Sequence, residues 1–239
     1  WYDRLLTNAE LQELHDLTRG GVDQPWSSEV PAIRNGLRNW WTFDQARIPA
    51  RVGAVAYYDG LETYHRDSVT GKDFWTEVNF TGITTEVAGK IGSAINLPND
   101  GSGGLPYLSS SLNEVELGDG TLAGSTSFTA VMWHWPDSGL SGATGKTIVN
   151  FGNFYMVAGH PKTNYDYRCI VYTTGGSGGS GDTPLTLPAL TPDAWNFIFL
   201  RWDQTAGKYE AGVIDSGTLY TSSVTPGPGA YLNAVTECR

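Results

Sequence analysis

Residues 127–135 have the sequence SFTAVMWHW, and this stretch decides the fold class of the 239-residue chain. In an extended strand, Phe128 and Met132 face one side, while Val131 and Trp133 face the other. Both faces are therefore largely apolar, which is typical of a strand that is covered on both sides. We expect residues 127–135 to form a central strand of a buried sheet.

The chain keeps the same character from Leu37 onward. Short aromatic and β-branched runs alternate with clusters of Gly, Pro, Asn and Asp, a pattern typical of sandwich or barrel strands. No helical pattern of more than two turns follows residue 36, which excludes a parallel sheet with crossover helices. The predicted strands are residues 37–43, 54–57, 93–97, 107–109, 127–135, 147–151, 154–158, 167–172, 195–202, 209–214 and 219–222.

The first residues are the one stretch with a clear helical pattern. Thr7 and Glu10 have the spacing of a capping box, in which two residues at the start of a helix satisfy each other's backbone amides. Three leucines then recur at helical spacing from Leu11 to Leu17, and a glycine pair ends the pattern. We predict a helix here, followed by a connector over residues 21–36.

The composition excludes two classes of partner. Fifteen basic residues stand against 25 acidic ones, which gives a net charge of −10. A nucleic-acid binder needs a basic face to displace counterions, and anionic membranes attract basic segments. No apolar run approaches the roughly 18 residues that a membrane-spanning helix needs. We therefore expect no nucleic-acid partner and no membrane insertion.

Two carboxylates are the best candidates for catalysis. Glu114 and Glu116 would share one face of a strand, and a retaining glycosidase needs two carboxyl groups about 5 Å apart. Gly118 and Gly120 follow closely and indicate a turn, so we favour a solvated acidic hairpin. The sequence contains no catalytic triad and no metal cage, and we expect no enzyme. A laminarinase-like glycan hydrolase that uses Glu114 and Glu116 stays as the alternative.

Two further sets of residues carry possible chemistry. Asp67 and Asp73 bound a loop that could supply some of the oxygen ligands that calcium takes. Asp and Gly are also ordinary turn formers, and we favour a turn without a metal. Cys169 and Cys238 could form one disulfide in an oxidising compartment, or remain two free thiols.

Four separated stretches resemble strands of the laminin G-like, concanavalin A-like jelly-roll modules. They are residues 37–44 (LRNWWTFD), 89–97 (GKIGSAINL), 127–133 (SFTAVMW) and 193–203 (DAWNFIFLRWD). Their order and spacing are similar to those of the family. The resemblance implies an all-β, two-sheet antiparallel jelly-roll sandwich over residues 37–239, with a short N-terminal helix.

Residues 1–11, WYDRLLTNAEL, resemble the closing segment that ends such a domain. Here the segment comes first, so we assign residues 1–20 as a closing segment with its helix and residues 21–36 as a linker. A jelly roll without its final strand has an open edge, and a free helix of this length is marginal in water. We therefore predict that residues 1–17 dock on a jelly roll, either this one or a neighbour's in a homo-oligomer.

The family is mostly non-catalytic, so the resemblance implies a binding module. Its members bind glycans or proteins through loops at one rim, often near a calcium ion. We therefore expect a glycan or a surface protein as partner. Tyr58, Tyr64 and Trp75 are the candidate contacts, because aromatic rings in loops stack on sugars. Each of them could equally pack its loop against the core. Asp67 and Asp73 are the candidate calcium ligands.

The setting follows from a further similarity. Residues 17–21, LTRGG, resemble the exit from such modules in tailed-bacteriophage particle proteins. The chain also begins with Trp1 rather than Met and shows no signal peptide, so we expect a piece of a longer chain. The expected location is a virion surface or another extracellular surface. A purely structural virion decoration protein is the remaining alternative to a binding module.

Overall fold

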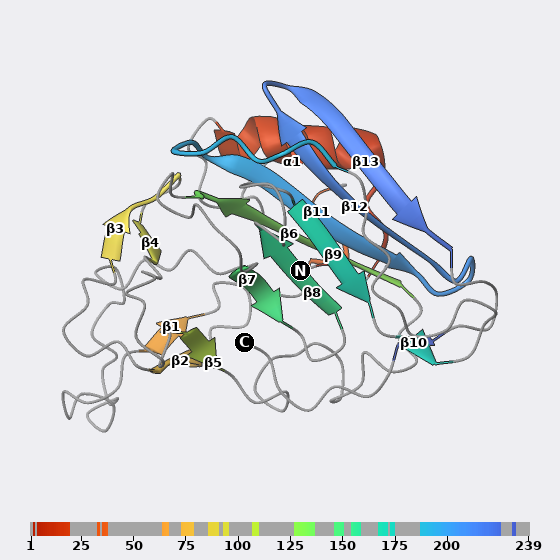
Figure 1. Ribbon diagram of the computed structural model, residues 1–239, viewed down its shortest axis with the longest axis horizontal. Helices are drawn as coiled ribbons and strands as arrows, with labels where there is room; N and C mark the ends of the chain where they lie inside the picture. The colour runs from red at the N-terminus through yellow and green to blue at the C-terminus, as the bar shows by residue number, and fades with distance from the viewer. Residues whose placement is uncertain are drawn as a thin grey trace.

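The computed structural model contains one helix and fourteen strands among the residues that it describes (Figure 1). Those residues are 2, 4–19, 33, 35–37, 64–66, 73–78, 86–90, 93–95, 107–109, 127–136, 146–150, 154–158, 167–171, 173–174, 187–225 and 231–232. The elements are α1 (Asn8–Arg19), β1 (Tyr64–Arg66), β2 (Asp73–Val78), β3 (Glu86–Ala88), β4 (Ser93–Ile95), β5 (Tyr107–Ser109), β6 (Ser127–His134), β7 (Lys146–Asn150), β8 (Phe154–Ala158), β9 (Tyr167–Val171), β10 (Thr173–Thr174), β11 (Asn196–Asp203), β12 (Lys208–Asp215), β13 (Thr218–Val224) and β14 (Tyr231–Leu232).

The largest sheet has four antiparallel strands in the order β13-β12-β11-β6. Its last hairpin is fixed by local chemistry, because only Ser216 and Gly217 lie between the paired residues Asp215 and Thr218. Both turn residues have positive φ angles, 49° and 81°, as a type I′ turn requires. The remaining strands form smaller sheets in the orders β7-β8-β9, β1-β2-β5, β3-β4 and β10-β14.

Helix α1 begins with the predicted capping box. The backbone N–H of Glu10 donates to Thr7 Oγ1 at 3.2 Å, and the N–H of Thr7 donates to Glu10 Oε2 at 2.8 Å. The predicted helix is thus confirmed, and it ends at Arg19. Its apolar stripe buries Leu11 and Leu14 completely, so α1 is held by tertiary packing as well as by its cap.

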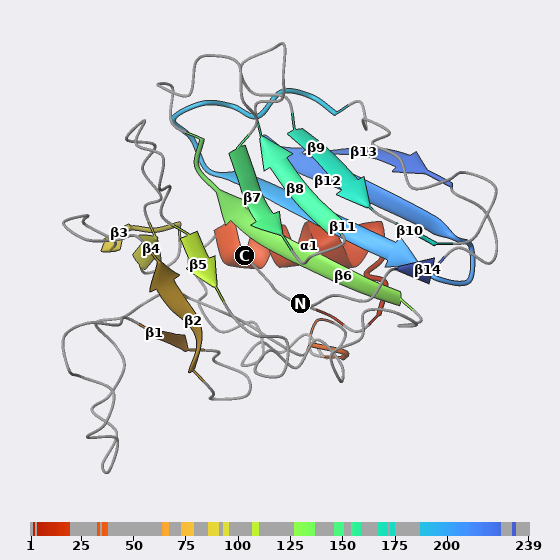
Figure 2. The same ribbon diagram turned by 60° about the horizontal axis from the view of Figure 1, so that its bottom comes forward.

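Helix α1 covers one face of the four-stranded sheet (Figures 1 and 2). Leu11 and Leu14 share a core cluster with Phe197 and Phe199 of β11 and with Ile214 of β12. Each of these side chains is at most 2% exposed. The apolar face of the helix and the first face of the sheet therefore form one continuous core.

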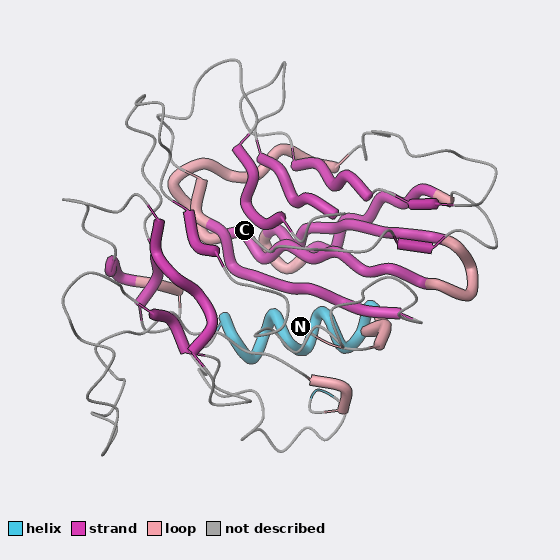
Figure 3. Tube along the Cα trace, turned by 90° about the horizontal axis from the view of Figure 1, so that it is seen from below, coloured by secondary structure: helices cyan, strands magenta, loops and turns pink. Residues whose placement is uncertain are grey.

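The second face of the sheet is also buried. Ile198, Leu200 and Trp202 of β11 alternate with the helix-facing residues and are fully inaccessible. Phe128 of β6 and Val213 of β12 are each 1% exposed. Figures 2 and 3 show β7, β8 and β9 on the side of the sheet away from α1, and β9 lies against β12. The structure is thus a β-rich fold with a four-stranded antiparallel sheet, in which β11 and most of β12 are buried on both faces.

The position of β6 corrects one expectation. Among the residues that the structure describes, β6 is the last strand in the order of its sheet and not a central one. The N-terminal segment occupies its free side: Tyr2 N–H donates to Thr129 O at 2.8 Å, and Thr129 N–H donates to Tyr2 O at 3.0 Å. Tyr2 also bridges to Leu37 on its other side. The apolar pattern of β6 predicted its burial. The outer edge of β6 is protected by the N-terminal segment, which is distant in sequence.

The other strand predictions have mixed outcomes. From residue 93 to 224, the predicted strands coincide with β4 to β9 and β11 to β13, with ends that differ by at most two residues. β1 and β2 were not expected from the sequence, and neither were β3, β10 and β14. Of the predicted strand 37–43 the structure describes only Leu37, and the predicted strand 54–57 lies outside the described residues.

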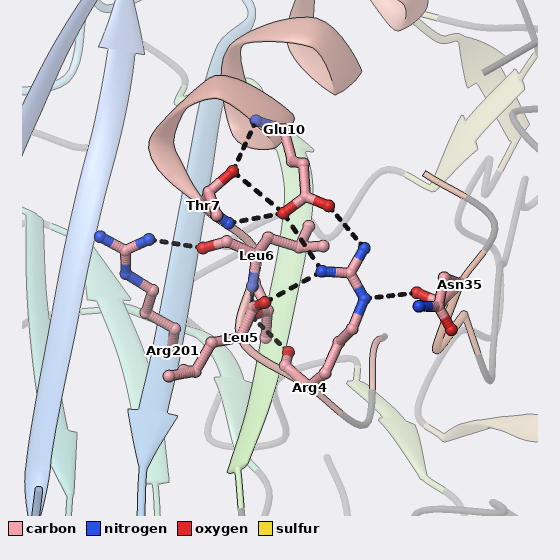
Figure 4. Close-up of polar contacts among 8 residues, drawn as sticks. Arg4, Leu5, Leu6, Thr7, Glu10, Asn35 and Arg201 are labelled. Carbon is pink, nitrogen blue, oxygen red and sulfur yellow. Dashed lines mark hydrogen bonds and ion pairs between the residues drawn. The ribbon is translucent and has the colours of Figure 1, made fainter. Parts of the chain in front are cut away.

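The N-terminal segment docks on this chain's own sheet, which is one of the two alternatives that the sequence predicts. Thr129 is fully buried, and its hydroxyl donates to Arg4 O and accepts from the N–H of Leu6, both at 2.9 Å. Arg201 of β11 donates to Leu6 O at 2.5 Å (Figure 4). It also donates to Asn8 Oδ1 at 2.7 Å. The backbone groups of the segment are therefore satisfied by two side chains of the sheet.

Arg4 ties the segment to the start of α1 (Figure 4). Its guanidinium binds both carboxylate oxygens of Glu10, at 2.8 and 3.1 Å, and its Nε donates to Asn35 O at 2.6 Å. This paired hydrogen bond lowers the pKa of the Glu10 carboxyl. The arginine thus holds the strand-like residues before the helix, the first turn of the helix, and Asn35 in one arrangement.

Candidate functional site

Two tryptophans, one exposed and one partly buried, lie where β6 ends and β11 begins. Trp135 is 46% exposed, and Tyr220 is the other large hydrophobic side chain exposed among the described residues. Because His134 pairs with Asn196, Trp135 and Trp195 are the next positions along the two strands. Their ring centroids lie 5.5 Å apart and the ring planes meet at 71°. We call Trp135 and Trp195 the aromatic corner.

The backbone around the aromatic corner is fixed by a buried amide. The side-chain oxygen of Asn196 accepts from the N–H of Thr191 at 2.9 Å, and its Nδ2 donates to the carbonyls of Thr191 and Ala194 at 2.9 and 2.8 Å. Across the corner, Asp193 N–H donates to Pro136 O at 2.8 Å. The turn before Trp195 is therefore tied to β11 and to the residue after Trp135.

A packed aromatic cluster supports the corner from within the molecule. Trp133 precedes Trp135 by two residues and lies on the same face of β6. Its ring meets Phe197 edge to face at 5.3 Å and His15 of α1 at 5.3 Å, and its Nε1 donates to Thr18 Oγ1 at 2.9 Å. The ammonium of Lys90 lies 5.2 Å from the centre of the same ring. The aromatic corner is thus adjacent to a well-packed part of the interface between α1 and the sheet.

His134 lies beside the corner and faces the other side of β6. The residue keeps part of its surface exposed, but its Nε2 is buried and has no hydrogen-bond partner among the described residues. Burial lowers the pKa of His134 to about 4. The imidazole is therefore neutral at physiological pH.

The site residues predicted from the sequence fall mostly outside the described part of the chain. Backbone positions are known for four of them: Tyr64 lies on β1, Trp75 and Asp73 lie on β2, and Cys169 lies on β9. The backbone pairing of β1 with β2 places His65 opposite Trp75 and Arg66 opposite Asp73. Outside the described residues lie Tyr58, Asp67, Glu114, Glu116 and Cys238.

Within the described residues, no group of three or more His, Cys, Asp or Glu side chains is placed to hold a metal ion. No helix in that same part is long and apolar enough to cross a membrane. Comparison of the chain with protein-family models, with curated proteins and with solved structures gave no match. The case for a function therefore rests on the geometry of this chain alone.

The aromatic corner was not singled out in the sequence. Both tryptophans belong to predicted strands, where an aromatic residue is expected to pack into the core. One sequence signal could have identified them: Trp135 ends the predicted strand 127–135, and Trp195 begins the predicted strand 195–202. That signal becomes useful only once the register of β6 against β11 is known, because the register brings the two ends together.

Proposed function

We propose that this chain is a non-catalytic glycan-binding module whose contact surface is the aromatic corner. The observation that carries the proposal is the exposed ring of Trp135, in contact with the partly buried Trp195, on a backbone held by hydrogen bonds. Leaving a large indole in water forgoes the free energy of burying its apolar surface, about 25 cal/mol per Å². An indole also offers a rigid apolar face with a polar N–H at its edge, which suits the C–H face and hydroxyl rim of a sugar ring.

The finer fold that we propose is the two-sheet antiparallel jelly-roll sandwich of the laminin G-like, concanavalin A-like family. Burial of both faces of the four-stranded sheet supports it, because a sheet covered by α1 on one face needs a second layer on the other. The position of β7, β8 and β9 away from α1 also supports it (Figure 3). In such a sandwich the aromatic corner lies at one rim, where the strands end.

The proposed setting is a virion surface or another extracellular surface, with a glycan or a glycosylated surface protein as partner. The net charge of −10 disfavours strongly anionic partners. A neutral glycan is therefore the class of ligand that fits the corner best. No observation within the described residues favours the hydrolase alternative, since Glu114 and Glu116 lie outside them.

A glycan array probed with the wild-type chain and with Trp135→Ala tests the proposal. We expect binding to at least one glycan and at least a tenfold loss of affinity in the variant. Tyr220→Ala is the matched control: Tyr220 is similarly exposed at 41%, but it lies on β13, at the opposite edge of the sheet from β6. Loss of binding in both variants, or no binding by the wild type, would contradict the proposal and favour a purely structural role.

A further inference from the structure

The angle between the two tryptophan rings restricts what can stack on them. Trp135 and Trp195 meet at 71°, with centroids 5.5 Å apart. Consecutive sugar rings of an extended, ribbon-like polysaccharide need aromatic faces that are nearly coplanar and spaced along the chain. Two rings in edge-to-face contact cannot provide this, because the edge of one ring occupies part of the face of the other.

We infer that the aromatic corner binds one sugar ring, at the end of a glycan chain, and not the interior of a linear polysaccharide. A single pyranose can place its C–H face on the exposed indole of Trp135 while its edge contacts the less exposed Trp195. The inference rests on the proposed function, because it assigns the ligand class of the same corner.

The backbone on both sides of the corner is held in place by hydrogen bonds. The turn before Trp195 makes three hydrogen bonds with the Asn196 side chain, so its backbone cannot move freely to bring the two rings into one plane. A fourth hydrogen bond joins Asp193 N–H to Pro136 O. A preorganised site of this kind favours a ligand that fits the existing angle.

The test compares affinities for a monosaccharide and for its linear oligomer. Titration calorimetry would use glucose with cellohexaose, N-acetylglucosamine with chitohexaose, and any terminal sugar that the array identifies with its own oligomer. For each sugar that binds, we expect the dissociation constants of the monosaccharide and of its oligomer to differ by less than about threefold. Trp135→Ala should weaken the binding of both at least tenfold. The Tyr220→Ala variant should keep both affinities.

The outcomes separate the inference from the proposed function. An oligomer that binds at least tenfold more tightly than its monosaccharide, with loss in Trp135→Ala, would overturn the inference and leave the glycan-binding function intact. No binding of any sugar, or binding that Trp135→Ala leaves unchanged, would overturn both. Binding of a peptide at the corner, with no sugar bound, would also overturn both.

Discussion

At the scale of single residues, Thr129 is the joint between the N-terminal segment and the sheet. Its backbone pairs with Tyr2. Its buried hydroxyl donates a hydrogen bond to Arg4 O and accepts one from the N–H of Leu6. A valine would keep the shape of the side chain but leave two backbone groups without their partner. The hydrogen bond to the Leu6 N–H is buried, whereas the one to Arg4 O is part-buried, and one buried backbone group that loses its partner costs about 1–3 kcal/mol.

We predict that Thr129→Val lowers the free energy of unfolding by about 1–3 kcal/mol, measured by urea denaturation. Thr221→Val on β13 is the matched control, because Thr221 is exposed in the same sheet and exposed substitutions usually change stability by less than about 0.5 kcal/mol. Equal losses in the two variants would contradict the role assigned to Thr129.

His134 makes a second prediction at this scale, on pH dependence. Its folded-state pKa of about 4 lies below the roughly 6.5 of an exposed imidazole, so the folded state binds fewer protons than the unfolded state between these values. The free energy of unfolding should therefore fall as the pH drops below about 6.5 and level off near pH 4, by about 3 kcal/mol in total from this residue.

Urea denaturation of the wild type and of His134→Gln across this pH range measures the effect. The variant should lose much of the pH dependence between about pH 6.5 and 4, while its stability at pH 8 reports any packing cost separately. A variant whose stability falls with pH as steeply as that of the wild type would show that His134 is not the responsible group.

At the scale of elements, α1 acts as the cover of the first sheet face. Leu14 is fully buried against the cluster that contains Phe197 and Phe199. We predict that Leu14→Ala lowers the free energy of unfolding by about 2–5 kcal/mol, measured by thermal or urea denaturation. Arg19→Ala, at an exposed position of the same helix, is the control and should be nearly neutral. A neutral Leu14→Ala would mean that α1 does not pack on this sheet in solution.

The same scale shows what the sequence could and could not predict. The helix was predictable because its signals are local: Thr7 and Glu10 are three residues apart and satisfy each other directly. Strands such as β6 and β11 were predictable from their composition. The pairing of Tyr2 with Thr129 was not, because no periodic pattern encodes a contact between residues that are 127 positions apart. β2 was mistaken for part of a loop because an Asp/Gly-rich turn signal precedes it.

For the candidate site, too, the residue type could be predicted from the sequence, but the long-range strand pairing that builds the site could not. Aromatic residues were expected to make the contacts, but the ones singled out were Tyr58, Tyr64 and Trp75. The corner depends on strand register, since β6 and β11 must pair with His134 opposite Asn196 before Trp135 can meet Trp195. Among the tryptophans whose burial the structure describes, the exposed ring of Trp135 then stands apart from the partly or fully buried rings of Trp133, Trp195 and Trp202.

At the scale of the whole molecule, the part of the chain that the structure describes has an exposed tryptophan, Trp135, next to backbone that is held by hydrogen bonds. Helix α1 packs on one face of the four-stranded sheet, and side chains of β11 and β12 are buried on the other face. The outer edge of β6 pairs with Tyr2. The corner extends beyond this sheet at the end of two paired strands. Its rings carry no charge in a chain of net charge −10, so stacking and not ionic attraction is the expected driving force.

The indole N–H resonances of the nine tryptophans test the central claim most directly. A ¹H–¹⁵N NMR titration with the best glycan from the array, assigned through Trp135→Phe and Trp195→Phe, would report each ring separately. The account predicts that the signals of Trp135 and Trp195 shift, while that of the buried Trp202 stays in place. Saturable shifts at other tryptophans, with those of Trp135 and Trp195 unchanged, would contradict it.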